Sequence, residues 1–240
     1  MVLSFRNTAS NAMTSKDICI ILPTLNEEQA IGKVITEIPR SELEKMGYSV
    51  DILVVDGNST DRTMQIAREM GARTLIEKRK GKGRAVRTAL EETQAKYIFM
   101  MDGDYTYPAT YIPAMIQVLK DYPVVVGSRL KGARQKGALR MMNLIGNYSL
   151  TCLAKILYKT QISDLCTGYW GFRGEAIKSL NLTTEGFQLE AELLTQIVKR
   201  GYKIGEIPIL YRTRPGKAKL SVIKDGVKIA WLLVSRRFHN

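Results

Sequence analysis

Two aspartates one residue apart, Asp102 and Asp104, follow the apolar run of residues 97–101. Carboxylates on a tight turn offer hard oxygen ligands, and Mg²⁺ or Mn²⁺ usually binds one or two of these while substrate phosphates complete the shell. The pair therefore indicates a divalent metal held on a diphosphate, as in nucleotide-sugar chemistry. An Asp-Gly-Asp turn also ends strands that bind nothing, so the motif alone leaves both interpretations open.

The charge balance points to anionic partners. The 240 residues include 36 Lys and Arg against 23 Asp and Glu, a net charge of +13, and 45% are hydrophobic, enough to bury a core. Basic residues concentrate in three stretches that contain no acid, residues 78–87, 129–140 and 212–219. A solvated surface is the ordinary interpretation of such stretches, and nucleic acid, anionic membrane and phosphorylated substrates are the functional ones.

Composition disfavours several other kinds of site. The cysteines at 19, 152 and 166 lack a CxxC spacing, and His239 is the only histidine. We therefore expect neither a zinc site nor a Ser-His or Cys-His nucleophile, and free thiols are typical of the cytoplasm. Residues 1–16 read as a loose leader without the apolar core of a secretory signal, and no stretch reaches the roughly 18 apolar residues of a membrane span.

Short apolar segments alternate with helical ones in the first half. We expect strands at 18–22, 51–55, 73–76, 97–101 and 124–126, and helices at 27–37, 60–70, 82–94 and 111–119. This alternation predicts an α/β fold with a mainly parallel sheet flanked by helices, whose ligands collect at the carboxyl ends of the strands. The loops at 23–27, 56–61 and 102–104 should converge on one cleft, which lacks a dinucleotide or Walker phosphate loop.

The second half has a different pattern. We expect an amphipathic helix at 137–158, a helix at 187–199, an edge strand at 204–210 and an apolar tail with basic residues at 222–238. Trp170 and Phe172 are expected in the core rather than against a sugar. We divide the chain into a leader (1–16), a catalytic domain (17–220, with halves 17–127 and 128–220) and a basic amphipathic tail (221–240).

A set of motifs along residues 17–225 resembles the inverting family 2 glycosyltransferases of GT-A fold, and among them the dolichyl-phosphate mannose and glucose synthases. The motifs are Pro23-Thr24-Leu25-Asn26-Glu27, Val54 to Thr63, Gly81-Lys82-Gly83, Met101-Asp102-Gly103-Asp104, Gly127-Ser128-Arg129, Asp164 to Arg173, Glu206-Ile207-Pro208 and Arg212 to Ser221. Each is weak singly, and together they are specific. The resemblance implies transfer of a hexose, with inversion, from a nucleotide sugar to dolichyl or another polyprenyl phosphate.

The resemblance also implies roles for individual residues. It assigns the nucleotide sugar to Pro23, Asn26, Glu27, Asp56, Lys82, Asp102 and Asp104, and Mg²⁺ or Mn²⁺ to Asp102 and Asp104. It assigns the acceptor phosphate to Arg129, Arg212, Arg214 and Lys217, and catalytic roles to Asp104, Arg129 and Asp164. A phosphate monoester is already anionic near neutral pH, so such an acceptor needs positioning and charge screening rather than a histidine base.

Other roles for these residues stay open. Glu27 and Asp61 also suit helix N-termini, and Asp164 suits a cap or a buried salt bridge. Gln188, Glu190 and Glu192 suit either the donor sugar or a solvated helix face. The sequence departs from the family motifs at Leu25, Gly57 and Thr106. GDP-mannose and UDP-hexoses such as UDP-glucose and UDP-N-acetylglucosamine therefore all remain candidate donors.

Other functions stay open as well. A soluble family 2 enzyme with a glycan or small hydroxyl acceptor would need a carboxylate base such as Asp164 or Glu190. A nucleic-acid-binding protein explains the charge but not the acidic loops, which repel phosphate, and a non-catalytic nucleotide-sugar-binding relative is a third alternative. For a lipid acceptor we expect peripheral contact with the cytoplasmic membrane face through residues 137–158 and 222–238, although ordinary packing against the sheet is the alternative.

Overall fold

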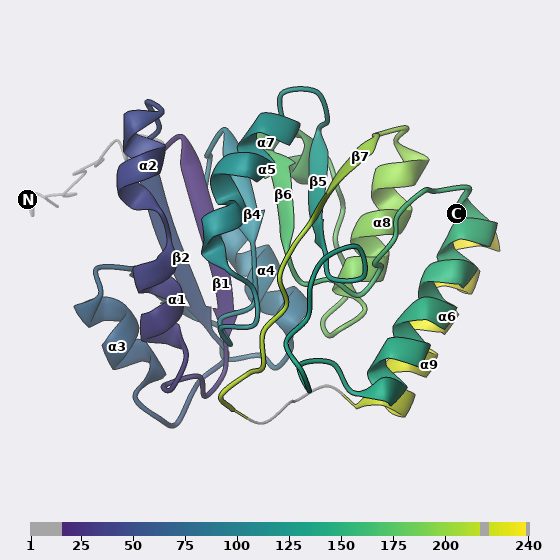
Figure 1. The fold of residues 1–240 in the computed structure, drawn as a ribbon, viewed down its shortest axis with the longest axis horizontal. Coiled ribbons are helices and arrows are strands. Elements are labelled where there is room, and N and C mark those ends of the chain that lie inside the picture. Colours follow the sequence, from purple (N-terminus) through teal and green to yellow (C-terminus); the bar gives the residue numbers. More distant parts are fainter. Residues whose placement is uncertain (1–15, 217–220, 239–240) are drawn as a thin grey trace, which may run out of the picture.

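The computed structural model describes residues 16–216 and 221–238 and shows one seven-stranded sheet between two layers of helices (Figure 1). The strands follow the order β3-β2-β1-β4-β6-β5-β7, and only β6 runs antiparallel to its neighbours β4 and β5. Their bounds are β1 Ile18–Thr24, β2 Val50–Asp56, β3 Arg73–Ile76, β4 Tyr97–Met100, β5 Val124–Ser128, β6 Trp170–Arg173 and β7 Ile204–Pro208. The expected mainly parallel α/β sheet is confirmed, and β7 lies at its edge as expected.

Alternate residues of the strands face two separate cores. Ile18, Ile20 and Leu22 of β1 pack toward one face, while Cys19 and Ile21 pack toward the other. The first face is covered by α1 (Ile31–Glu37), α2 (Arg40–Lys45), α3 (Thr63–Glu69), the short helix η1 (Ala109–Tyr111) and α5 (Ile112–Val118). The second is covered by α4 (Lys82–Glu91), α6 (Met141–Tyr158), α7 (Gly174–Lys178), α8 (Leu189–Lys199) and α9 (Val222–Phe238).

The structure corrects several expected bounds: α6 begins at Met141 rather than at 137, α4 ends at Glu91 rather than at 94, and β7 ends at Pro208 rather than at 210. Helices α1 and α3 begin at Ile31 and Thr63 rather than at 27 and 60, because the preceding residues form loops that hydrogen-bond to one another. The antiparallel strand β6 and the short helices α2 and α7 were not predicted. Trp170 and Phe172 on β6 are buried and stacked with ring centroids 5.9 Å apart, which confirms their expected place in the core.

The sheet continues through both expected halves of the catalytic domain, since β6, β5 and β7 extend it beyond β4. Because the sheet is continuous, the division at residue 127 stays a prediction about which half binds the donor and which the acceptor. Within the described residues, no helix has the length and apolarity needed to cross a membrane.

Candidate functional site

The carboxyl ends of β2, β1 and β4 lie side by side and carry the three loops that the sequence predicts to converge. Thr24 at the end of β1 is in register with Asp56 at the end of β2, and β4 pairs with β1 on its other side. The Asp56 carboxylate is buried and accepts hydrogen bonds from the Thr24 hydroxyl (3.2 Å), the Ser59 hydroxyl (2.5 Å) and the Ser59 N–H (2.7 Å). The loops thus form one edge of the sheet.

The first two loops are fixed to each other by short polar contacts. Asn26, with a φ of 50°, accepts a hydrogen bond from the Thr60 N–H at 2.9 Å through its side-chain oxygen. The Glu27 N–H donates to the Thr63 hydroxyl at 2.8 Å. Asp61 accepts hydrogen bonds from the Thr63 N–H and hydroxyl at the start of α3, so its role as a helix-terminus residue is the one observed. Pro23 is half-buried within β1.

The third loop meets a lysine from the start of α4. The Lys82 ammonium lies 2.5 Å from Asp102 Oδ1 and 2.6 Å from Glu190 Oε1 of α8. Burial alone would lower the pKa of Lys82, but the two carboxylates raise it above its usual value. Burial raises the pKa of Glu190, Lys82 opposes this and Asp102 adds to it, which leaves the pKa above its usual value. One cation is therefore shared by two acids.

A second cation reaches the same loop from the segment after β7. The Arg214 guanidinium lies 2.8 Å from Glu27 Oε1 and 3.3 Å from Asp104 Oδ2. Asp104 is buried and also accepts hydrogen bonds from the Thr106 N–H and hydroxyl. Burial and the nearby charge of Asp102 raise the pKa of Asp104, although Arg214 lowers it. We call Asp102, Asp104, Glu190, Glu27, Lys82 and Arg214 the strand-end cluster.

Gly168 fixes how close the chain can come to Asp102, and sequence reasoning did not single it out. A Cβ at this position would lie 2.5 Å from Asp102 Oδ2, so any side chain would displace the carboxylate. The sequence did contain a sign of this contact, namely a glycine within the motif of residues 164–173. Glycine often stands where the backbone approaches another group closely. Gly103 meets a similar constraint from the Thr24 methyl group at 2.5 Å.

The donor set at Asp102 and Asp104 suits a hard divalent cation. Both residues present carboxylate oxygens at one turn, and burial together with the nearby charge of Asp102 raises the pKa of Asp104, so a cation bound there would stabilise its ionised form. In the described part of the chain, no group of three or more His, Cys, Asp or Glu side chains is placed to hold a metal. Two carboxylates completed by substrate phosphates is nevertheless the arrangement that Mg²⁺ and Mn²⁺ commonly adopt, so the residues fit.

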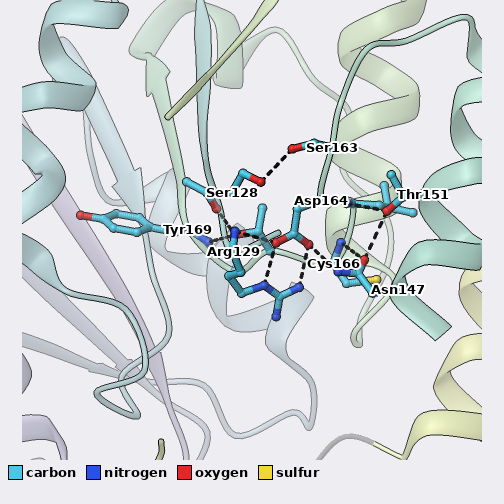
Figure 2. A network of polar contacts seen from close by, with 12 residues as sticks. Ser128, Arg129, Asn147, Thr151, Ser163, Asp164, Cys166 and Tyr169 are labelled. Carbon is cyan, nitrogen blue, oxygen red and sulfur yellow. Dashed lines mark hydrogen bonds and ion pairs between the residues drawn. The ribbon is translucent and has the colours of Figure 1, made fainter. Parts of the chain in front are cut away.

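Arg129 and Asp164 form a buried bidentate ion pair of their own (Figure 2). The Asp164 carboxylate accepts hydrogen bonds from Arg129 Nε (2.8 Å), Nη2 (2.7 Å) and backbone N–H (2.9 Å), and from the Asn147 amide (2.6 Å). Burial would raise the pKa of Asp164, but Arg129 and these hydrogen bonds hold it below its usual value. The buried salt bridge considered for Asp164 is thus present, and the catalytic roles of both residues remain predictions.

The predicted acceptor-phosphate residues are not gathered at one point. Arg212 forms a bidentate pair with Glu37 of α1 and lies over the Tyr105 ring, 4.6 Å from its centroid. Arg214 belongs to the strand-end cluster, and Arg129 to the pair with Asp164. Lys217 lies outside the described residues.

The three basic stretches prove to be tied to acids that are distant in sequence. The observed ion pairs include Arg84–Glu185, Lys131–Glu206, Arg129–Asp164, Arg212–Glu37 and Arg214–Glu27. These ion pairs show that several of the basic side chains stabilise the fold, whereas the net charge of +13 already counts their acidic partners. The solvated helix face considered for Glu190 and Glu192 is wrong, because both side chains are buried.

Comparisons with known proteins show which family the chain belongs to. The sequence model of the family described as Glycosyl transferase family 2 matches residues 19–180. A Haloferax volcanii protein named dolichyl-phosphate hexose transferase is 37% identical over 92% of this chain and 94% of its own length. The glycosyltransferase AglJ of the same organism is 36% identical over 89% of this chain and 69% of its own. Dolichol-phosphate mannosyltransferase of Pyrococcus furiosus is 28% identical over 85% of this chain and 59% of its own.

Solved structures support the fold. Glucosyl-3-phosphoglycerate synthase from Mycobacterium tuberculosis, in complex with Mn²⁺ and UDP-glucose, aligns with a TM-score of 0.71 at 23% identity. The alignment covers 92% of this chain and 79% of that one. The expected GT-A fold is confirmed by this likeness together with the family match. The chain belongs to glycosyl transferase family 2.

Proposed function

We propose that this protein transfers a hexose, with inversion at C1, from a nucleotide sugar to dolichyl or another polyprenyl phosphate. The relative named dolichyl-phosphate hexose transferase, which aligns over nearly the whole of both chains, supports the acceptor. The observation that carries the proposal is the strand-end cluster, where carboxylates, Lys82 and Arg214 meet at the ends of parallel strands.

The donor half of the reaction is assigned to the three strand-end loops. Asp56 would accept hydrogen bonds from the ribose or base, and Pro23, Asn26 and Glu27 would shape the same pocket. Asp102 and Asp104 would hold Mg²⁺ or Mn²⁺, and Lys82 would contact the diphosphate. When bound, the metal offsets the negative charge that develops on the departing nucleoside diphosphate.

The contacts of Asp164 and Glu190 support a phosphate acceptor. A hydroxyl acceptor would need one of these two carboxylates as its general base. Asp164 is held by Arg129 and Asn147, and Glu190 lies 2.6 Å from the Lys82 ammonium. Either residue would have to break an ion pair before accepting a proton. A phosphate acceptor has no such requirement, because its oxygen is already anionic and attacks C1 directly. Arg212 and Arg214 would screen the repulsion between the two anionic substrates.

Peripheral membrane contact is the second part of the proposal, and two exposed apolar stripes support it. Helices α6 and α9 pack side by side at one end of the molecule (Figure 1). Exposed apolar residues recur every three or four positions on α9: Ile223, Val227, Trp231, Val234 and Phe238. Met141, Ile145, Tyr148 and Ile156 are exposed on α6. Lys224 and Lys228 are exposed on α9 and would attract anionic headgroups of the cytoplasmic face.

The transfer reaction can be tested with labelled GDP-mannose, UDP-glucose and UDP-N-acetylglucosamine. Each would be incubated with dolichyl phosphate and Mn²⁺ or Mg²⁺, with EDTA as the control. We expect metal-dependent labelling of the lipid from one donor. Transfer only to dolichol or to glycan hydroxyls would replace the phosphate acceptor, and binding without any transfer would favour the non-catalytic alternative.

Membrane contact has its own test. Sedimentation with phosphatidylglycerol-containing vesicles should fall about tenfold when Val227 and Trp231 are both changed to Ser, since apolar area buried in the interface drives such binding. Ile76→Ser is the matched control, because Ile76 is 51% exposed on β3. Equal losses in both proteins would assign the effect to general hydrophobicity rather than to α9.

A further inference from the structure

Residues 182–186 lie directly on the backbone around Lys82. The Arg84 N–H donates to the Glu185 carbonyl at 3.3 Å. A Cβ added at Gly81 would overlap the Glu185 carbonyl oxygen, and one at Gly83 would overlap that of Thr184. Gly81 also has a φ of 129°, which side chains rarely permit. The two segments therefore touch backbone to backbone, and a displacement of one would displace the other.

The 182–186 segment is held in turn by Glu192, whose side chain is fully buried on α8. Its carboxylate accepts hydrogen bonds from the Thr183 N–H (2.9 Å) and hydroxyl (2.8 Å), and from the Thr184 N–H (2.8 Å) and hydroxyl (2.6 Å). Burial would raise the pKa of Glu192, but these donors hold it below its usual value. The donor and acceptor assignments give this carboxylate no role.

Cationic side chains reach the same segment from two helices. From α4, Arg87 donates to the Thr183 carbonyl at 3.1 Å, and Arg84 pairs with Glu185. From α9, Arg236 donates to the Thr183 hydroxyl at 2.7 Å and pairs with Glu192. Part of the first basic stretch thus serves to clamp this segment rather than to bind an external anion.

We propose that Glu192 is a positioning residue for Lys82: by holding the 182–186 segment against the glycines on either side of Lys82, it keeps the ammonium between Asp102 and Glu190. The proposal rests on the proposed function only in assigning Lys82 to the donor diphosphate. Glu190 and Glu192 lie on the same helix, so α8 fixes both the ammonium and the backbone that carries it.

Glu192→Gln is the informative change because it preserves shape and removes one acceptor. Both carboxylate oxygens of Glu192 accept hydrogen bonds, whereas a glutamine offers one acceptor oxygen and would turn an NH₂ group toward a donor. A hydrogen bond to a charged group contributes about 1.5–3 kcal/mol, so losing one can change a binding constant roughly tenfold. We expect the donor KM to rise about tenfold, with a much smaller change in kcat.

Hydrogen–deuterium exchange of the full chain without ligand tests whether Glu192 affects the backbone around Lys82. If Glu192 only stabilised its own surroundings, the exchange rate at Arg84 would not change. In Glu192→Gln, exchange should accelerate about tenfold at the Thr183 and Thr184 amides and also at Arg84, whose amide joins the two segments. The Ile20 amide in β1 should keep its wild-type rate. Acceleration at Thr183 and Thr184 with an unchanged rate at Arg84 would overturn the proposal.

Arg236→Gln provides a second variant on a partly exposed residue, with Arg237→Gln on its exposed neighbour as the matched control. Arg236→Gln should accelerate exchange at Arg84 and raise the donor KM, both less than Glu192→Gln does, and Arg237→Gln should do neither. Equal behaviour of the two arginine variants would overturn the proposal even if Glu192→Gln loosens the whole protein. If the wild type turns over no nucleotide sugar, the proposed function fails, and the Arg84 rates still support or overturn the link from Glu192 to Lys82.

Discussion

Two of the ionic clusters among the described residues differ in how completely their charges are offset. In the strand-end cluster, four carboxylates share two cations among the described residues. Asp102 and Glu190 contact Lys82, and Glu27 and Asp104 contact Arg214. In the other cluster, the single carboxylate of Asp164 receives four hydrogen bonds from Arg129 and Asn147. The Asp102 side chain is 31% exposed, whereas that of Asp164 is fully buried.

From this difference we infer that the strand-end cluster can exchange its present contacts for a ligand, whereas the Arg129–Asp164 pair stabilises the fold. A partly exposed carboxylate with an incompletely offset neighbour gains from an additional cation, so a metal or a substrate can replace the present contacts. A buried carboxylate whose two oxygens are both hydrogen-bonded is not stabilised further by a new ligand. Removing either member of such an ion pair leaves an unpaired charge in the protein interior. We therefore expect substitutions in the first cluster to affect ligand binding and turnover, and those in the second to affect stability.

The largest expected effect is on stability, from Asp164→Asn. This change leaves the Arg129 guanidinium buried without its counter-charge, which costs about 3–5 kcal/mol of unfolding free energy. Urea denaturation followed by circular dichroism would measure the loss. The paired change of Arg129→Met with Asp164→Leu should recover much of it, because no buried charge remains. If Asp164→Asn unfolds like the wild type, this pair does not hold the fold.

The next largest effect is on turnover, from Asp104→Asn. The amide keeps the size of the carboxylate but removes the charge that would hold the metal, so we expect a loss of about 100-fold or more in kcat/KM. The unfolding midpoint should stay close to that of the wild type, in contrast to Asp164→Asn. Wild-type turnover in this variant would remove Asp104 from the metal site.

The convergence of the three strand-end loops was predictable from the sequence, because it follows from the parallel direction of the strands. Parallel strands end at one edge, so Asp56 and Asp102 could be brought together from the alternation of strands and helices alone. The loop boundaries were less predictable, since Asn26 and Glu27 precede α1 and hydrogen-bond instead to Thr60 of the second loop and to Thr63 at the start of α3.

The remaining contacts depend on residues far apart in sequence. The Lys82–Glu190 pair spans 108 positions and needs α8 to pack on the same face of the sheet as α4, which no local pattern specifies. Strand β6 is inserted antiparallel between β4 and β5, so the Gly168 contact with Asp102 follows from tertiary packing. The charge run at 129–140 likewise gave no sign that Arg129 would be buried against Asp164, 35 positions away.

A smaller effect should distinguish the two arginines that follow β7. Arg214 contacts Asp104, so Arg214→Gln removes a positive charge that competes with a metal there. We expect Mn²⁺, measured by calorimetry without nucleotide, to bind about tenfold more tightly, because a like charge about 4 Å away costs at least about 1 kcal/mol. Arg212→Gln is the control, since Arg212 pairs with Glu37 instead. Tighter Mn²⁺ binding in both variants would indicate a general charge effect.

The smallest expected effect is a pH dependence confined to the Asp164 cluster. Because Arg129 and the hydrogen bonds hold the pKa of Asp164 below its usual value, ionised Asp164 contributes stability that is fully present above the unfolded pKa of about 3.9. That contribution is lost as the pH falls through the lower folded pKa, whereas the amide introduced by Asp164→Asn cannot titrate. Urea unfolding of the wild type and Asp164→Asn should therefore show a constant difference from about pH 7 to about pH 5 and a narrowing one below about pH 4. A difference that stays constant down to about pH 2.5 would mean that the carboxylate charge of Asp164 is not what stabilises this cluster.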